Sequence, residues 1–205
     1  MKYKHIVFDI DGTLIDTEYA LLHSLQETIL DLCGRHIPLK ELTFALGITG
    51  ADALKRLGMK DIAPTIDLWN EKMQKYTDTI KVFDGIKDLL EHLSKSACET
   101  GIVTSKTREE FDLDFRPFGI SHYFKTIICA DDTTQHKPSP APLLQYMKSS
   151  GAAHSQLLYI GDSSYDSLCA SNAQAAFALA KWGSHDETIK ADYYLTTPAS
   201  LLHLN

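Results

Sequence analysis

Two aspartates, Asp9 and Asp11, are the residues of this sequence best placed to do chemistry. They follow a short apolar run at residues 5–8, which predicts a buried strand of a parallel sheet. Ligands of open α/β sheets bind outside the carboxyl ends of the strands, so both carboxylates fall where a binding site is expected. Gly12 comes next and permits a backbone conformation that a residue with a side chain would resist. The alternative is an ordinary turn, because Asp also favours turns and helix caps.

Two hydroxyl residues, Thr104 and Ser105, end a second apolar stretch, which predicts a strand over residues 99–104. A helix is expected to start at Ser105. The hydroxyls and the first N–H groups of that helix would then all be able to donate to a phosphate. The alternative is a simple helix cap, since Ser and Thr cap helices regardless of function.

Lys137 lies in the string Lys-Pro-Ser-Pro, which leads into a helix predicted over residues 140–149. Prolines on both sides of Ser139 restrict the backbone and pre-organise the turn. A lysine in this place can neutralise charge on a phosphoryl group during its transfer. The alternative is a solvated surface lysine, the usual environment of this residue type.

Asp162 and Asp166 form a further acidic pair. Asp162 follows a strand predicted over residues 156–160, and Asp166 lies one helical turn further on. Such oxygen ligands suit Mg²⁺, which takes only a few carboxylates and keeps several waters. Alternatively, Asp166 caps the helix predicted over residues 164–172.

The elements that must position these residues alternate between strand and helix. Strands are predicted at residues 5–8, 99–104, 124–130, 156–160, 175–179 and 193–195, and helices at residues 84–95, 105–115, 140–149 and 164–172. Repeated strand-then-helix units predict an α/β fold of the Rossmann type, a doubly wound parallel sheet covered by helices on both faces. The candidate site residues all follow strands, so we expect them to meet at one edge of this sheet.

Residues 17–81 interrupt this alternation. Helices are predicted over residues 17–33, 51–57 and 64–76, with another starting at Pro38, and no convincing strand is found. We therefore expect a core of residues 1–16 and 82–205 with a helical insert of residues 17–81. The insert is either a bundle that stabilises the core or a lid that excludes water. The lid is favoured if Asp9 forms a covalent intermediate, because water control then matters.

The composition narrows the function classes. The 205 residues carry a net charge of −7 with no basic run, so nucleic-acid binding is not expected. The four cysteines match no zinc or redox spacing, and they indicate a reducing compartment. No signal peptide and no membrane-spanning stretch is found, so we expect a cytoplasmic protein. The oligomeric state is not indicated.

Taken in order, these motifs resemble those of the haloacid dehalogenase-like hydrolase superfamily. They are Asp9-Ile10-Asp11-Gly12-Thr13, then Thr104, then Lys137-Pro138-Ser139-Pro140, and lastly Gly161-Asp162 with Asp166. The resemblance covers nearly the whole chain and implies that residues 17–81 are a mobile helical cap. Residues 50–52 and 130–144 look like those of phosphoglycolate phosphatases and related pyrophosphatases.

The resemblance implies an enzyme, a phosphatase acting on a small phosphorylated metabolite through an aspartyl-phosphate. Asp9 would be the nucleophile, and Asp11 would serve as general acid and then as general base. Thr104, Ser105 and Lys137 would hold the phosphoryl oxygens.

The same resemblance implies Mg²⁺ as cofactor. Asp9, Asp162 and the backbone carbonyl of Asp11 would hold the ion, with Asp166 behind them. The metal would offset repulsion between the substrate phosphate and these carboxylates.

Alternatives share these motifs. A sugar phosphomutase of the β-phosphoglucomutase type has the same core, but its cap carries Gly-Val-Ser-Arg where this chain has Gly47-Ile48-Thr49-Gly50. An inorganic pyrophosphatase also stays open, as does a regulatory binding protein on the same fold, although the intact acidic motifs argue against the latter. Thr49, Lys55 and Arg56 are candidate specificity residues of the cap, and the sequence does not indicate which phosphate ester is the substrate.

Overall fold

The computed structural model describes residues 2–204 of the chain. Its centre is a sheet of six parallel strands in the order β5-β4-β1-β6-β7-β8. The strands are β1 His5–Phe8, β4 Glu99–Val103, β5 Thr126–Ile128, β6 Leu157–Gly161, β7 Ala176–Ala180 and β8 Tyr193–Leu195. The predicted doubly wound parallel sheet is therefore confirmed.

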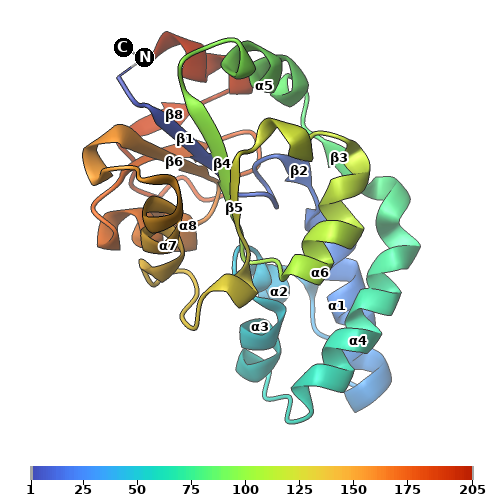
Figure 1. Ribbon diagram of the computed structural model, residues 1–205. Coiled ribbons are helices and arrows are strands. Elements are labelled where there is room, and N and C mark those ends of the chain that lie inside the picture. Colours follow the sequence, from blue (N-terminus) through green and yellow to red (C-terminus); the bar gives the residue numbers. More distant parts are fainter. Residues whose placement is uncertain (1, 205) are drawn as a thin grey trace.

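Both faces of this sheet are covered, which explains why its strands are continuous apolar runs in the sequence. Ile6 and Phe8 belong to a hydrophobic cluster that includes helix α5, Ile86–Ser94. Val7 points to the opposite face, where its cluster includes helices α7, Ala141–Ser150, and α8, Ser164–Asn172. Figure 1 shows α7 and α8 together on one side of the molecule, away from α5.

Four further helices lie together at one end of the molecule, at the lower right of Figure 1. They are α1 Glu18–Cys33, α2 Leu39–Leu42, α3 Gly50–Arg56 and α4 Ile62–Met73. They share a hydrophobic cluster of their own, in which the indole N–H of Trp69 donates to Ser24 Oγ at 2.9 Å. None of the helices within residues 2–204 is long and apolar enough to cross a membrane.

A short antiparallel ribbon joins this helical segment to the sheet. Strand β2, Ile15–Asp16, pairs with strand β3, Lys81–Val82. The ribbon lies at the limits expected for the helical insert. The sequence did not predict it, because two residues are too few to show a strand periodicity.

The helix expected over residues 105–115 begins later than predicted. Helix α6 covers Arg108–Glu110 and continues as a π-helical turn over Phe111–Phe115. Thr107 caps it by accepting a hydrogen bond from the backbone of Glu110, whose own carboxylate accepts from the backbone of Thr107. Residues 104–106 therefore form a loop at the carboxyl end of β4.

Candidate active site

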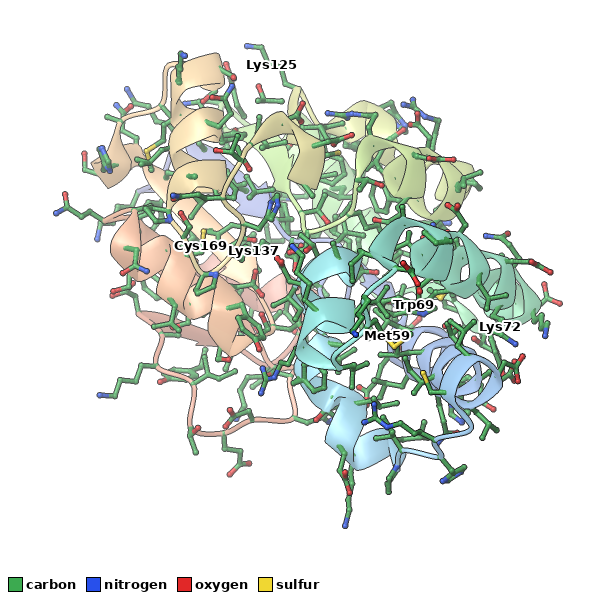
Figure 2. All side chains as sticks on the ribbon, turned by 90° about the horizontal axis from the view of Figure 1, so that it is seen from below. Met59, Trp69, Lys72, Lys125, Lys137 and Cys169 are labelled. Carbon is green, nitrogen blue, oxygen red and sulfur yellow. The ribbon has the colours of Figure 1, made fainter. Side chains whose placement is uncertain are left out.

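Asp9 lies at the carboxyl end of β1 and is buried, with 2% of its surface exposed. Its backbone N–H donates to the carbonyl oxygen of Ile160 in the neighbouring strand at 2.8 Å, which fixes its position. Lys137 Nζ lies 2.9 Å from Asp9 Oδ1 and is itself buried. In the view of Figure 2, Lys137 and Cys169 of α8 lie on one side of the molecule, and Trp69 and Lys72 of α4 lie on the other. The surface alternative for Lys137 is therefore wrong, and the structure brings it together with Asp9.

Asp166 has no exposed surface and lies behind this pair. Its Oδ1 accepts hydrogen bonds from Lys137 Nζ at 2.8 Å and from the hydroxyl of Tyr159 at 2.9 Å. Its Oδ2 accepts from the backbone N–H of Ser163 at 3.1 Å, as part of the capping box that starts α8. The capping interpretation of Asp166 is confirmed, and the same carboxylate also positions Lys137, a contact that the sequence did not indicate.

Replacing Asp166 by alanine is expected to destabilise the fold by about 3 kcal/mol, because buried donors of Lys137, Tyr159 and Ser163 each lose an acceptor and α8 loses its capping box. The matched control is Asp112→Ala, which removes an exposed pair with Arg116 and should change the free energy of unfolding by less than about 1 kcal/mol. Urea unfolding followed by circular dichroism measures both. Equal small losses would show that the Asp166 network contributes little to stability.

Three carboxylates, those of Asp9, Asp162 and Asp166, each place one oxygen within 4.8 Å of the others. Burial raises the pKa of Asp9 to about 7, although Lys137 opposes the shift, and burial also raises the pKa of Asp162 well above its usual value. One lysine faces the three carboxylates, which leaves two negative charges when all are ionised. Apart from the ion-pair contact with Lys137 at 2.9 Å, Asp9 Oδ1 makes no hydrogen bond within residues 2–204. A divalent cation with oxygen ligands, such as Mg²⁺, fits this group.

Gly12 leaves room for this acidic group. Its φ is +73°, a left-handed conformation that favours glycine, and a Cβ there would lie 2.3 Å from Asp162 Oδ2. The hydroxyl of Thr13 donates to the other carboxylate oxygen of Asp162 at 2.9 Å. The turn after β1 therefore holds Asp162 against Asp9.

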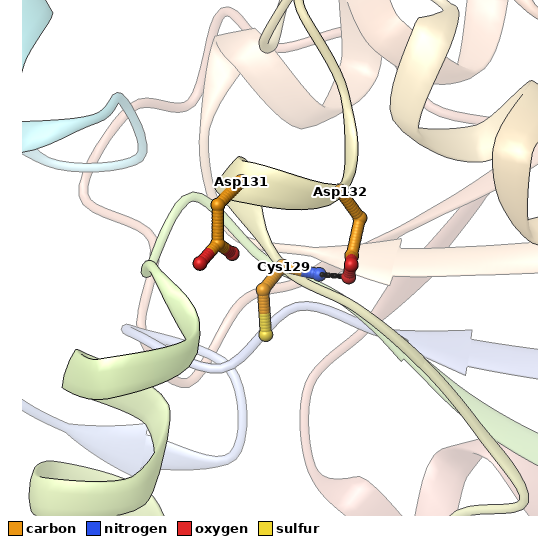
Figure 3. Close-up of side chains that lie close together, drawn as sticks. All are labelled: Cys129, Asp131 and Asp132. Carbon is orange, nitrogen blue, oxygen red and sulfur yellow. Dashed lines mark hydrogen bonds between the residues drawn. The ribbon is translucent and has the colours of Figure 1, made fainter.

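A second group of possible metal ligands consists of Cys129, Asp131 and Asp132 (Figure 3). Both aspartates of this group make hydrogen bonds within the chain. Asp132 accepts hydrogen bonds from the backbone of Cys129 at 2.8 Å and from the side chain of Arg108 at 2.9 Å. Asp131 accepts from the backbone N–H of Arg108 at 3.1 Å. Burial raises the pKa of the Cys129 thiol to about 12, which disfavours the thiolate that a metal requires. These residues tie the start of α6 to the end of β5.

Asp11 lies apart from the three-carboxylate group. Its Oδ1 accepts a hydrogen bond from the Thr17 hydroxyl at 2.8 Å and lies 3.3 Å from Lys106 Nζ. Lys106 Nζ also donates to Asp114 Oδ2 at 2.8 Å. The structure thus separates the carboxyl group of Asp11 from the group that would hold a metal.

Lys106 is buried, with 7% of its surface exposed. Its sequence position alone indicated no role for it. Burial alone would lower the pKa of Lys106, but the carboxylates of Asp11 and Asp114 more than offset this and raise it. The only signal in the sequence is its place, directly after the hydroxyls of Thr104 and Ser105. That signal is weak because most lysines at the start of a helix are solvated.

Thr104 and Ser105 both lie in the loop after β4. Thr104 is buried, and its hydroxyl accepts the backbone N–H of Lys106 at 3.1 Å. The hydroxyl of Ser105 donates to the carbonyl oxygen of Gly47, in the loop before α3, at 2.9 Å. Neither residue caps α6, since Thr107 does, so the capping alternative is wrong.

A cavity of about 60 Å³ separates these residues from the helical segment. Asp9, Asp11, Ser105 and Lys106 line it on the sheet side. The helical segment lines it with uncharged side chains, those of Leu21, Ala45, Ile48, Trp69, Asn70 and Met73. Glu110 and Asp114 also line it, so the cavity is bounded by uncharged side chains of the helical segment on one side and by four carboxylates and one lysine on the other.

The three cap residues proposed from sequence as specificity residues do not line this cavity. Thr49 caps α3 by accepting a hydrogen bond from the backbone of Asp52, and Lys55 lies 3.4 Å from the Asp52 carboxylate at the surface. Arg56 donates to the hydroxyl of Tyr165 at 3.2 Å. Each has a structural contact that accounts for it.

Comparison with known proteins places this fold and site in a family. The sequence model of the haloacid dehalogenase-like hydrolases matches residues 6–180. The chain belongs to this family of hydrolases, as its motifs predicted.

Individual relatives match along nearly their whole length. The "Putative pyrophosphatase PpaX" of Clostridium perfringens is 30% identical over 210 residues, covering 98% of this chain and 96% of that protein. The "Pyrophosphatase PpaX" of Bacillus velezensis is 26% identical over 204 residues, covering 97% and 94%. The crystal structure of a "putative phosphoglycolate phosphatase" from Lactobacillus plantarum has a TM-score of 0.90 and 30% identity, with 100% of both chains covered. The last match agrees with the expected subgroup.

Proposed function

We propose that this protein is a Mg²⁺-dependent phosphatase that hydrolyses a small phosphate ester through an aspartyl-phosphate on Asp9. The observation that carries the proposal is the buried pair of Asp9 and Lys137, at the edge of the cavity and beside Asp162 and Asp166. Membership of the hydrolase family and the names of the relatives support it.

Asp9 attacks phosphorus in this mechanism and must be a carboxylate to do so. Its contact with Lys137 favours the ionised form, while burial opposes it. Mg²⁺ would be held by Asp9, by Asp162 and by the backbone carbonyl of Asp11. When bound, it neutralises carboxylate and phosphoryl charge. Asp166 keeps Lys137 directed at Asp9 throughout.

Asp11 protonates the leaving oxygen and then takes a proton from the attacking water. The hydrogen bond from Thr17 and the contact with Lys106 both use Oδ1 of Asp11, which leaves Oδ2 for proton transfer. The two contacts hold the carboxyl group against the cavity.

Thr104, Ser105 and Lys137 hold the phosphoryl oxygens in this proposal. Residues 17–81 act as the cap, with the β2–β3 ribbon as its connection to the core formed by residues 1–16 and 82–205. The hydrogen bond from Ser105 to Gly47 supports a closed form in which water is excluded.

The first test is hydrolysis of p-nitrophenyl phosphate with and without Mg²⁺, followed by a screen for phosphate release from phosphoglycolate, sugar phosphates, nucleotides and pyrophosphate. The names of relatives make pyrophosphate the second candidate substrate. Release of phosphate from none of these compounds would favour the regulatory binding protein.

Incubation with β-glucose 1-phosphate, Mg²⁺ and a bisphosphate primer is expected to give slow phosphate release and no glucose 6-phosphate. A mutase must hold a second phosphate away from the metal, usually with the planar fork of an arginine. Gly50 stands in place of that arginine, and the helical segment lines the cavity with no cation within the described residues. A coupled dehydrogenase assay measures glucose 6-phosphate. Its formation faster than phosphate release would overturn the phosphatase assignment.

A further inference from the structure

We propose that the leaving group of the substrate lies in a groove beside the cavity, and that Glu110 selects a leaving group with a positive charge. The substrate class is then the phosphate ester of a short amino alcohol. This inference rests on the proposed function and adds the chemistry of the alcohol that leaves.

The groove lies between the helical segment and α6. Its volume is about 670 Å³, and its walls come from α3 and α4 on one side and from the segments 105–113 and 130–136 on the other. The cavity beside Asp9, of about 60 Å³, is far smaller than the roughly 300 to 1,000 Å³ of sites that hold whole small ligands. Part of the substrate must therefore lie in a neighbouring space. Four residues line both the cavity and the groove, and they are Gly50, Asn70, Ser105 and Glu110.

The charge of the groove walls indicates which leaving group fits there. No lysine or arginine lines the groove within residues 2–204, whereas four carboxylates do, those of Asp67, Glu109, Glu110 and Asp131. Arg108 is close in the sequence, but its guanidinium group pairs with Asp132 at 2.9 Å. A cleft lined by charges of one sign attracts ligands of the opposite sign and repels those of the same sign. An ammonium group is therefore favoured in this groove over a carboxylate or a second phosphate.

Glu110 is the carboxylate best placed to bind that ammonium group, because it lies where the cavity meets the groove. Its Oε2 accepts the backbone N–H of Thr107 at 2.8 Å, as part of the capping box that starts α6. Its Oε1 has no hydrogen-bond partner among the described residues and is able to accept an N–H of the ligand. Asn70 of α4 adds an uncharged polar side chain at the same junction.

Lys106 does not reverse the sign of the charge at this junction. Its Nζ lies 2.8 Å from Asp114 and 3.3 Å from Asp11. Burial lowers the pKa of Lys106, but the carboxylates of Asp11, Asp114 and Glu110 more than offset this and raise it. Three carboxylates thus surround one lysine, and the excess charge that the leaving group meets is negative.

The test compares three esters of equal length. Phosphoethanolamine, 2-hydroxyethyl phosphate and phosphoglycolate each have two carbon atoms, and they end in an ammonium, a hydroxyl and a carboxylate group. The wild type is expected to show kcat/KM values that fall in this order, with at least about fivefold between the first and the last, the effect of one partly exposed ion pair. A kcat/KM for phosphoglycolate equal to or above that for phosphoethanolamine would overturn the inference.

The ammonium group also makes its alcohol a better leaving group, so the decisive quantity is the change in the ratio of the two kcat/KM values between variants. Glu110→Gln removes the charge, and glutamine is still able to complete the capping box. We expect this variant to lower the ratio of phosphoethanolamine to phosphoglycolate by about fivefold. Asp112→Asn changes an exposed carboxylate that pairs with Arg116 outside the groove, and it should keep the wild-type ratio. An equal loss on both substrates in Glu110→Gln would show a structural role only and would contradict the inference.

Calorimetry separates this inference from the proposed function. Asp9→Asn, which cannot form the aspartyl-phosphate, should bind phosphoethanolamine in Mg²⁺ more tightly than phosphoglycolate, and Glu110→Gln in that background should reduce the difference. Absence of all hydrolysis would contradict the proposed phosphatase, while the binding comparison would still decide the role of Glu110. Equal or tighter binding of phosphoglycolate would overturn the selection of a positively charged leaving group.

Discussion

Asparagine in place of Asp9 is expected to reduce phosphate release by a factor of about a thousand or more, because the side-chain amide keeps the shape of the carboxylate and removes the attacking charge. The fold should survive, since Lys137 keeps its contact with Asp166 at 2.8 Å. Steady-state hydrolysis of p-nitrophenyl phosphate measures the loss, and circular dichroism checks the fold.

The matched control for this variant is Asp16→Asn. Asp16 belongs to the same stretch of sequence but lies exposed on β2, outside the cavity. It should retain activity near that of the wild type. Turnover by Asp9→Asn within tenfold of the wild type would rule out a covalent mechanism through Asp9.

Removal of Mg²⁺ is expected to reduce phosphate release by a factor similar to that expected for Asp9→Asn. Excess EDTA should stop turnover in the wild type, and Asp162→Ala should need far more Mg²⁺ for half-maximal rate. Without the metal, the ionised carboxylates of Asp9, Asp162 and Asp166 exceed the single charge of Lys137 by two, and this excess repels a phosphate substrate. Activity measured over a Mg²⁺ titration tests both expectations.

A second measurement reports the metal without turnover. Mg²⁺ should raise the thermal midpoint of the wild type, because a ligand that binds only the folded state stabilises it. Asp162→Ala should lose this rise, while Asp131→Ala should keep it, because Asp131 belongs to the group that ties the start of α6. Full activity in EDTA, or an equal rise in all three proteins, would show that the metal does not bind at Asp162.

Ionisation of Asp9 is expected to make the stability of the metal-free protein depend on pH. The pKa of Asp9 is raised to about 7 by burial, so ionising this carboxyl group in the folded state is unfavourable. Its contribution should therefore lower the stability of the EDTA-treated protein as pH rises from the unfolded pKa near 4 toward about 7. Added Mg²⁺ would oppose this loss, because it favours the carboxylate.

Much of the fold was determined by local patterns of the sequence. Apolar runs such as residues 5–8 and 157–160 are recognisable because both faces of the sheet are buried. Residues that follow such runs must meet at one edge of a parallel sheet. The meeting of Asp9, Lys137 and Asp162 was therefore predictable without coordinates.

Tertiary structure decided what local patterns leave open. Lys106 resembles any exposed lysine in the sequence, and it is buried because Asp11 and Asp114, far apart in the chain, both reach its ammonium group. Asp166 both caps α8 and positions Lys137, which one capping pattern cannot reveal. On the helical side the cavity is lined by residues of α1, of α4 and of the segment between α2 and α3, so its uncharged character there depends on how these elements pack. Spacing along the chain thus fixed which residues reach the edge of the sheet, whereas the charge and size of the space above them depend on contacts between distant segments.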